Sequence, residues 1–238
     1  MKVSVIIPAY NEGTYITQTL AAVKAQDFQD DFEILVVDNA STDDTGSRAA
    51  AFPGVRVVRE EKKGVQHARE RGRREARGEI LVYLDADTLP PLGWLKNGTT
   101  YFKRPDIVGV SGPLDYYDAR PLFRRTSLVF QKIGYRGMHF LVHRVWRKGA
   151  VMVGGNSFIR ASAMERINGF NTAIVFYGDD TDTGRRLGSV GRVLYRNDIV
   201  VRSSARRFVR MGIMRVLALY LLNFFWVTVF HKPFFQKS

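Results

Sequence analysis

Residues 80–87 read Ile80-Leu81-Val82-Tyr83-Leu84-Asp85-Ala86-Asp87, and this stretch decides the fold. The apolar run of β-forming residues is typical of a buried strand. It ends in two carboxylates one residue apart, which a loop just past a strand can present to one point. Such a pair suits Mg²⁺ or Mn²⁺ carrying phosphate groups. An isolated Asp-x-Asp is more often an ordinary acidic turn, so the interpretation depends on the neighbouring sequence.

The residues before this stretch alternate strand-like and helix-like patterns. Strands are predicted at 3–7, 33–38, 55–58 and 80–84, and helices at 14–25, 43–51 and 64–77. Ser41 and Asp44 are expected to form a capping box for the second helix. The alternation implies an α/β fold with a mostly parallel sheet between layers of helices. Ligands bind beyond the carboxyl ends of such strands, so residues 8–12, 38–39 and 85–87 should meet in one crevice.

Composition restricts the class of protein. The chain has 238 residues, enough for one sizeable domain, and no cysteine, which excludes disulfides and thiolate metal sites. Its net charge of +13 attracts nucleic acid, anionic lipid or phosphorylated substrates. The first apolar run is too short for a signal peptide. We expect a cytoplasmic protein.

The positive charge is concentrated with apolar residues in the middle and tail of the chain. No acid occurs between Asp118 and Glu165 or after Asp198. Helices or a long loop–helix excursion are predicted over 115–148, two short strands around Gly154-Gly155, and further helices at 161–167 and 178–187.

The tail contains an almost wholly apolar run, residues 216–230, of about fifteen residues, which is short of the ~20 that span a bilayer. It predicts an interfacial helix that holds the protein peripherally at the cytoplasmic membrane. A tilted single span starting near Met211 and a core helix packed on the domain are the alternatives.

Six segments in order resemble the glycosyltransferase family 2 enzymes: residues 3–12, 36–45, 76–88, 155–160, 169–170 and 178–182. Each motif alone is weak, but the ordered set is specific. The resemblance implies a GT-A fold, a Rossmann-like and mainly parallel sheet flanked by helices, over residues 1–205, followed by a membrane-associating tail over 206–238. It also implies metal-dependent, inverting sugar transfer from a nucleotide-diphosphate sugar, with UDP-sugars favoured, to a hydroxyl acceptor.

The resemblance further implies roles for individual residues. Asp87 would hold Mg²⁺ or Mn²⁺ on the donor diphosphate, Asp85 would contact the ribose or the metal shell, and Asp180 would be the general base. The residues implied to bind the rest of the donor are Pro8, Ala9, Tyr10 and Glu12 around the base and ribose, Asp38 at the base, and Arg206 and Arg207 at the phosphates.

The chemistry agrees with these roles, because sugar transfer needs the leaving phosphates neutralised and a base for the acceptor hydroxyl. Two positions depart from the family motif. Glu70 stands where the family usually has Asn, which bears on a hydrogen bond to the nucleotide. Asp179 precedes Asp180 where the family has Glu before Asp, which bears on acceptor orientation. As an alternative, Asp179, Asp180 and Asp182 are ordinary acids of a first helical turn.

Two other functions remain open on the sequence. Phosphatases of the haloacid dehalogenase type also place Asp-x-Asp after an apolar strand, but they leave residues 8–12 and Asp38 unexplained. A non-catalytic basic module would bind nucleic acid or anionic membranes. The basic window has no recognised nucleic-acid motif, so no nucleic acid is expected. The expected partners are a nucleotide-sugar donor, a lipid-linked or glycan acceptor, and an anionic membrane surface.

Overall fold

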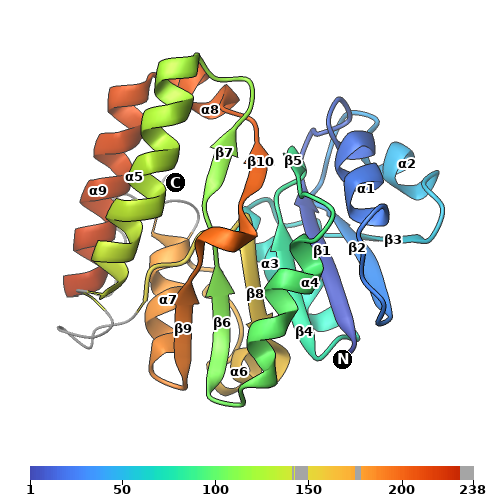
Figure 1. The fold of residues 1–238 in the computed structure, drawn as a ribbon. Helices are drawn as coiled ribbons and strands as arrows, with labels where there is room; N and C mark the ends of the chain where they lie inside the picture. The colour runs from blue at the N-terminus through green and yellow to red at the C-terminus, as the bar shows by residue number, and fades with distance from the viewer. Residues whose placement is uncertain (141, 143–149, 175–177, 231–238) are drawn as a thin grey trace.

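The computed structural model describes residues 1–140, 142, 150–174 and 178–230. Within these ranges a seven-stranded sheet runs through the centre of the molecule in the order β3-β2-β1-β4-β8-β6-β9 (Figure 1). Its strands are β1 Val3–Ala9, β2 Phe32–Asp38, β3 Val55–Arg59, β4 Ile80–Leu84, β6 Ile107–Ser111, β8 Asn156–Arg160 and β9 Arg192–Tyr195.

The first four strands of the chain are parallel, as the alternating sequence predicts. The helices between them are α1 Ile16–Lys24, α2 Thr45–Ala50 and α3 Val65–Glu75. β8 lies antiparallel between β4 and β6 and pairs Asn156 with Leu84, the last residue of β4. The sheet is therefore mixed but mainly parallel, and β8 brings its preceding Gly154-Gly155 turn beside Asp85.

A second, three-stranded sheet covers one end of the first, in the order β5-β10-β7. Its strands are β5 Thr88–Leu89, β7 Leu114–Tyr116 and β10 Val201–Ser203, and the remaining helices are α4 Trp94–Thr100, α5 Pro121–Phe140, α6 Ala161–Arg166, α7 Asp179–Gly188, α8 Arg206–Met211 and α9 Ile213–Phe230. Ser203 of β10 pairs with Thr88 of β5. This pairing places the segment just before α8 next to the residues that follow Asp87.

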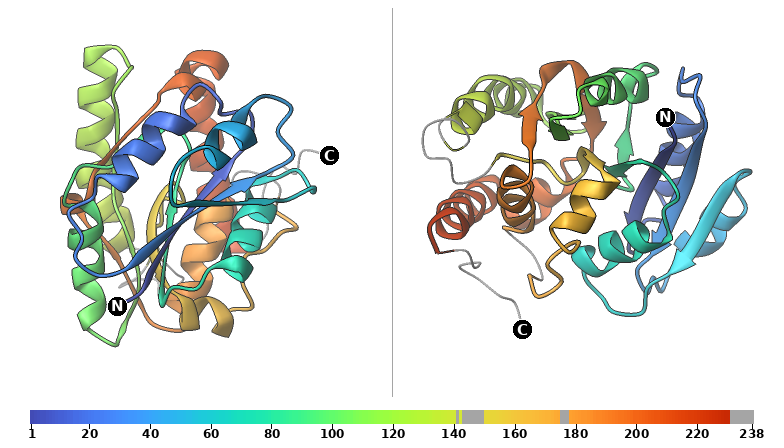
Figure 2. Two further views of the ribbon diagram at one scale, coloured as in Figure 1. Left: turned by 90° about the vertical axis from the view of Figure 1, so that its right-hand side faces the viewer. Right: turned by 90° about the horizontal axis from the view of Figure 1, so that it is seen from below.

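Two apolar clusters, one on each face of the large sheet, form the core, with helices on both sides (Figure 2). Val5 and Ile7 face α1, α2 and α4, whereas Ile6 faces α3, α6 and α7. Buried on both faces, the strands are nearly continuous apolar runs, as parallel strands usually are. The buried Trp94 indole donates to Asn156 Oδ1 at 2.9 Å, which leaves no unsatisfied donor there.

Two local predictions are wrong. The capping box of Ser41 and Asp44 does not form, because Ser41 Oγ accepts a hydrogen bond from the Asn11 N–H at 3.1 Å instead. Asp43 accepts from the Thr45 N–H at 3.0 Å and so takes over the capping role. Around Gly154-Gly155 there is one strand, β8, rather than two, since residues 150–153 have no regular structure.

The basic middle of the chain contains the predicted helix as α5, and the predicted helices at 161–167 and 178–187 are α6 and α7. Part of the predicted excursion, 141 and 143–149, and the last residues of the tail, 231–238, lie outside the described residues.

The apolar tail sequence forms α9, which packs against α7 and α8. Across the described ranges, no helix combines the length and the apolar character needed to cross a membrane.

Candidate active site

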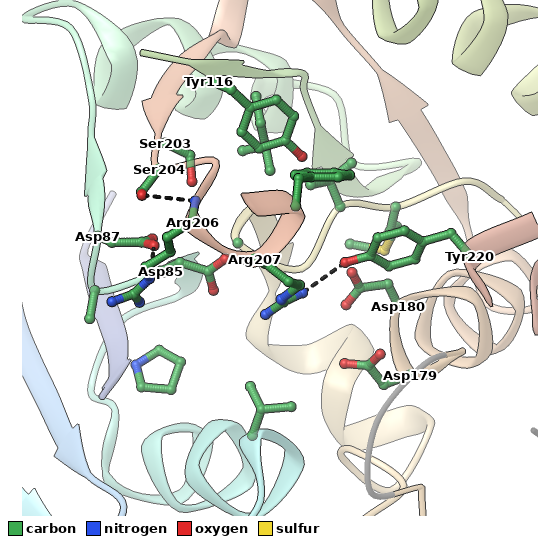
Figure 3. A pocket seen from close by; sticks show the side chains of 18 of the residues that line it. Asp85, Asp87, Tyr116, Asp179, Asp180, Ser203, Ser204, Arg206, Arg207 and Tyr220 are labelled. Atoms are coloured by element: carbon green, nitrogen blue, oxygen red, sulfur yellow. Dashed lines mark hydrogen bonds and ion pairs between the residues drawn. The ribbon is translucent and has the colours of Figure 1, made fainter. Parts of the chain in front are cut away.

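A cavity of about 940 Å³ lies beyond the carboxyl ends of β1 and β4 and is bordered by α5, α7, α8 and α9. The sequence-predicted residues that line it are Pro8, Ala9, Tyr10, Glu12, Asp85, Asp87, Asp180, Arg206 and Arg207. Figure 3 shows the Asp85–Asp87 side chains on one side and Asp179–Asp180 on the other, with Arg207 between them. Segments far apart in sequence thus bring opposite charges into one cleft.

On one side of the cavity, Arg206 holds two carboxylates. Its Nε lies 3.1 Å from Asp87 Oδ2, and the same guanidinium donates to Glu12 Oε1. Burial, reinforced by the neighbouring charge of Asp85, raises the pKa of Asp87 to about 7. Burial also raises the pKa of Glu12 above its ordinary value. Negative charge is costly here, and a bound cation would relieve that cost.

The oxygen atoms on this side fit a hard divalent metal. Asp85 and Asp87 offer carboxylates, and Glu12 Oε2 is buried without a hydrogen-bond partner. A Cβ at Gly155 would overlap the Asp85 carboxylate, so the turn before β8 is shaped around it. Among the described residues no cluster of three or more His, Cys, Asp or Glu could hold a metal alone. Mg²⁺ in particular usually binds one or two carboxylates plus substrate phosphates, so Asp85 and Asp87 would suffice.

On the other side, Arg69 of α3 joins both acids of α7. Its Nη1 lies 2.9 Å from Asp179 Oδ2 and 2.9 Å from Asp180 Oδ1. Asp180 Oδ2 also accepts from the Gly154 N–H at 2.8 Å. Arg69 Nη2 is 3.9 Å from Asp85 Oδ1, so this one buried guanidinium connects the two acidic sides of the cavity.

Asp179 and Asp180 occupy different environments. Burial, and then the charge of Asp180, raise the pKa of Asp179 to about 6. Asp180 keeps 35% of its side chain exposed and lines the cavity. Both carboxylates accept hydrogen bonds from Arg69, a residue 110 or 111 positions away in the chain. These long-range contacts go beyond what ordinary acids of a first helical turn would make.

Sequence reasoning missed Arg69. The signal was present, because α3 has few apolar residues and yet must cover a sheet face, so polar side chains had to be buried. Gln66, Arg69 and Glu70 are all buried. Buried charges are normally paired, which would have directed attention to acids elsewhere in the chain.

Two positions behave differently from the motif-based expectation. Asp38 does not line the cavity: its carboxylate accepts from the Ser41 N–H at 3.0 Å and lies 3.3 Å from Arg59 Nη1. Its neighbour Asn39 lines the cavity instead. Contact of Asp38 with the nucleotide base stays a prediction.

Glu70, the first departure from the family motif, also points away from the cavity. It accepts from the Phe170 N–H at 3.1 Å and pairs with Arg73 and Arg74. Its place is therefore in the junction between α3 and the loop after α6, where it ties the two together.

The outer half of the cavity is mostly apolar. One face of α5 supplies much of this wall, together with side chains from β7, α8 and α9; its aromatic and apolar members are Tyr116, Phe123, Phe130, Tyr135, Met138, Phe208, Ile213 and Tyr220. Arg207 Nη1 donates to the Tyr220 hydroxyl at 2.7 Å at the border with the acidic half. The sequence indicated the aromatic content of α5 but not that one of its faces borders the cavity.

Residues 4–167 match the model of the family described as Glycosyl transferase family 2. Glycosyltransferase AglE of Haloferax volcanii is 29% identical over 214 residues, which cover 87% of this chain and 68% of that protein. The O-antigen chain rhamnosyltransferase RfbN of Salmonella typhimurium is 25% identical over an alignment of 253 positions, covering 100% of this chain and 76% of that protein.

Among solved structures, the chain resembles the mannosyltransferase PcManGT of Pyrobaculum calidifontis in complex with GDP-Man and Mn²⁺. The TM-score is 0.74 at 26% identity, and the match covers 99% of this chain but 65% of that one. Neither the phosphatase nor the non-catalytic alternative accounts for these similarities. The family model matches well over half of the chain. The protein is therefore a glycosyltransferase that belongs to glycosyl transferase family 2 and has the GT-A fold.

Proposed function

We propose that the protein transfers a sugar from a nucleotide-diphosphate sugar to a hydroxyl group with inversion at the anomeric carbon, using Mg²⁺ or Mn²⁺. The observation that carries the proposal is the opposition of two acidic groups across one cavity, Asp85 with Asp87 and Asp179 with Asp180 (Figure 3). The first would bind the donor and the second would activate the acceptor. A UDP-sugar is the favoured donor on the resemblance, and a GDP-sugar is the alternative.

On the donor side, Asp85 and Asp87 would hold the metal, and Pro8, Ala9 and Tyr10 would line the nucleoside. When bound, the cation would neutralise the diphosphate as it leaves. Arg207 extends into the cavity between the acidic groups and would add a second positive charge at the phosphates.

On the acceptor side, Asp180 would take the proton of the attacking hydroxyl. Each of its oxygens accepts one hydrogen bond, from Arg69 or from the Gly154 N–H, which leaves a second lone pair on each. The two bonds fix the carboxylate without using up its acceptor capacity. One base opposite the leaving group gives direct displacement and hence inversion.

The acceptor is proposed to be lipid-linked. A sugar or phosphate alone would leave the aromatic wall of α5, β7 and α9 in contact with water, whereas an apolar chain would bury it. The hydrogen bond between Arg207 and Tyr220 marks the border between the acidic half and the apolar wall. A ligand with a polar head group in the acidic half and an apolar chain along α5 would fill both parts of the cavity. A free glycan stacked on the aromatic rings is the second candidate.

The outer face of α5 supports contact with an anionic membrane. Leu122, Val129, Ile133 and Phe140 recur at a helical spacing that places them on one face of α5. Their exposures are 75%, 50%, 70% and 61%. Arg125, Lys132 and Arg136 flank this stripe. Apolar side chains beside cations are the pattern of helices that lie in the interface of anionic bilayers. We place the protein at the cytoplasmic membrane surface, with residues 206–238 as a further contact region.

The test has two stages. Purified protein is heated with UDP, GDP and other nucleoside diphosphates and Mn²⁺, and the cognate nucleotide should raise the melting temperature because it binds the native state. Transfer is then measured with the matching sugar donors and with lipid-linked and free glycan acceptors.

Asp180→Asn should keep the thermal stabilisation by nucleotide but lose transfer. Asp106→Asn, at an exposed acid beside Arg104 and Arg192, is the matched control and should retain both. Near-normal transfer by Asp180→Asn, or no stabilisation of the wild-type protein by any nucleotide, would contradict the proposal.

A further inference from the structure

Arg206 contacts the same carboxylate that would hold the metal. Its Nε lies 3.1 Å from Asp87 Oδ2, and it also pairs with Glu12. The guanidinium carbon stands 4.6 Å from the centroid of the Tyr15 ring, a cation–π contact. Arg206 therefore bridges the residues after β1 to those after β4, at the centre of the donor side.

The backbone that carries Arg206 is fixed by its neighbours. The Ala205 N–H donates to Asp118 Oδ1 at 2.6 Å, and the Ser204 hydroxyl donates to Asp118 Oδ2. Ser203 pairs with Thr88 in the small sheet. The side chain of Arg206, by contrast, is 39% exposed. It also lines the cavity, and turning into the cavity would not require its backbone to move.

A guanidinium and a divalent cation beside one carboxylate disfavour each other. The Asp87 carboxylate has lone pairs for both, but two positive centres a few ångströms apart repel. Arg206 pairs with Glu12 and Asp87, and the charge of Asp85 also acts on Asp87. A divalent cation held by Asp85 and Asp87 would neutralise more of this negative charge than one arginine does, so the two compete for Asp87.

We propose that Arg206 is an internal competitor of the metal: it pairs with Asp87 and Glu12 while the donor site is open, and it releases them to pair with the donor diphosphate. This rests on the proposed function, because it takes Asp87 as a metal ligand. The diphosphate gives the displaced guanidinium a new partner. Metal and nucleotide should therefore bind with positive coupling, each raising the affinity for the other.

The experiment measures Mn²⁺ affinity from the electron paramagnetic resonance signal of free Mn²⁺, without nucleotide and with saturating UDP or GDP. Arg206→Gln removes the competitor and should bind Mn²⁺ alone about tenfold more tightly than the wild type, the factor expected for one charge-assisted hydrogen bond. The gain in affinity on adding nucleotide should shrink in the same variant.

Arg207→Gln is the matched control, because it removes one positive charge at the next residue, whose guanidinium donates to Tyr220. Without nucleotide, when no phosphate engages Arg207, it should change Mn²⁺ affinity much less than Arg206→Gln. Arg206→Lys keeps the charge with fewer donors and should give an intermediate affinity, which preserves the test if Arg206→Gln fails to fold.

Unchanged or weaker Mn²⁺ binding by Arg206→Gln would overturn the inference, as would equal tightening in Arg207→Gln. Sugar transfer by the wild type is measured in parallel. Transfer together with unchanged Mn²⁺ affinity in Arg206→Gln would leave the proposed function standing and the inference refuted. Tightening without transfer would support the competitor and count against the proposed reaction.

Discussion

Arg69 and Asp180 are 111 positions apart in the chain, yet Nη1 of one lies 2.9 Å from Oδ1 of the other inside the cavity wall. The same nitrogen reaches Asp179 at the same distance. Arg69 is only 5% exposed, so water cannot take the place of either carboxylate beside it without a loss of stability. This contact holds the proposed base at the start of α7, where it lines the cavity.

Replacing Arg69 with Gln should lower both stability and transfer. Breaking a buried ion pair leaves uncompensated charge and typically costs about 3–5 kcal/mol. The acidic limb of the pH–rate profile should move to higher pH, because the Arg69 guanidinium lowers the pKa of Asp179, the neighbour of the proposed base, and the variant lacks it. Arg69→Lys should recover part of the stability and shift the profile less. A profile that stays in place while the rate falls would indicate a purely structural role.

Asp179 should make the protein less stable as pH rises. Its folded-state pKa is raised from 3.8 to about 6, mainly by burial. Between these values the native state keeps a proton that the unfolded chain has lost, so stability falls with increasing pH across this window and levels off once the pH has passed the folded-state value. Asp179→Asn stays neutral and should flatten that decline relative to the wild type in urea unfolding at pH 4, 5, 6 and 7. The same pH dependence of the unfolding free energy in both proteins would refute this prediction.

Gly178→Ala should destabilise the protein by about 1–3 kcal/mol. Gly178 has a φ of +89°, and a Cβ there would lie 2.6 Å from Val227 Cγ2 of α9. The strain falls directly before Asp179 and Asp180, so transfer should drop as well. Gly137→Ala is the control in urea unfolding: it lies in α5, where a Cβ would meet nothing within 4 Å, and should be neutral or slightly stabilising. Equal stabilities of the two variants would count against this reading.

Ile133→Glu should weaken binding to anionic vesicles. Ile133 is 70% exposed in the apolar stripe of α5, and a carboxylate there would meet both the hydrocarbon boundary and the negative head groups. Co-sedimentation with phosphatidylglycerol vesicles measures the loss. Leu92→Glu is the control, since Leu92 is 64% exposed in the loop before α4. Equal loss in both variants would argue against a specific membrane face.

The parts of the fold that were predictable depend on local pattern. The first four strands and three helices follow from apolar runs and helical spacing, and the convergence of residues 8–12 and 85–87 follows from parallel topology. The antiparallel position of β8 was not predictable, because strand order depends on contacts between distant segments. The predicted capping box of Ser41 and Asp44 was lost to a contact between Ser41 and Asn11, which are 30 positions apart, and Asp43 accepts from the Thr45 N–H instead.

The same limit applies to the cavity. Motif order located Asp85, Asp87 and Asp180. The composition of α3 signals a buried charge at Arg69 but not which acids pair with it, and nothing local turns Asp38 away from the cavity. Glu70 departs from the family motif in the sequence, and the structure shows what it does instead: it accepts a hydrogen bond from the Phe170 N–H. Which buried charges pair with each other depends on the three-dimensional structure. A single sequence shows only which charged residues are available to pair.

The position of α5 separates two kinds of evolutionary change. It packs on β7 and β9, whereas the proposed nucleoside pocket is built on β1 and β4, and two strands, β8 and β6, lie between β4 and β9. Substitutions along the aromatic wall can therefore accumulate without disturbing the loops that follow β1 and β4. A lineage can in this way exchange one acceptor for another while its donor chemistry is inherited intact.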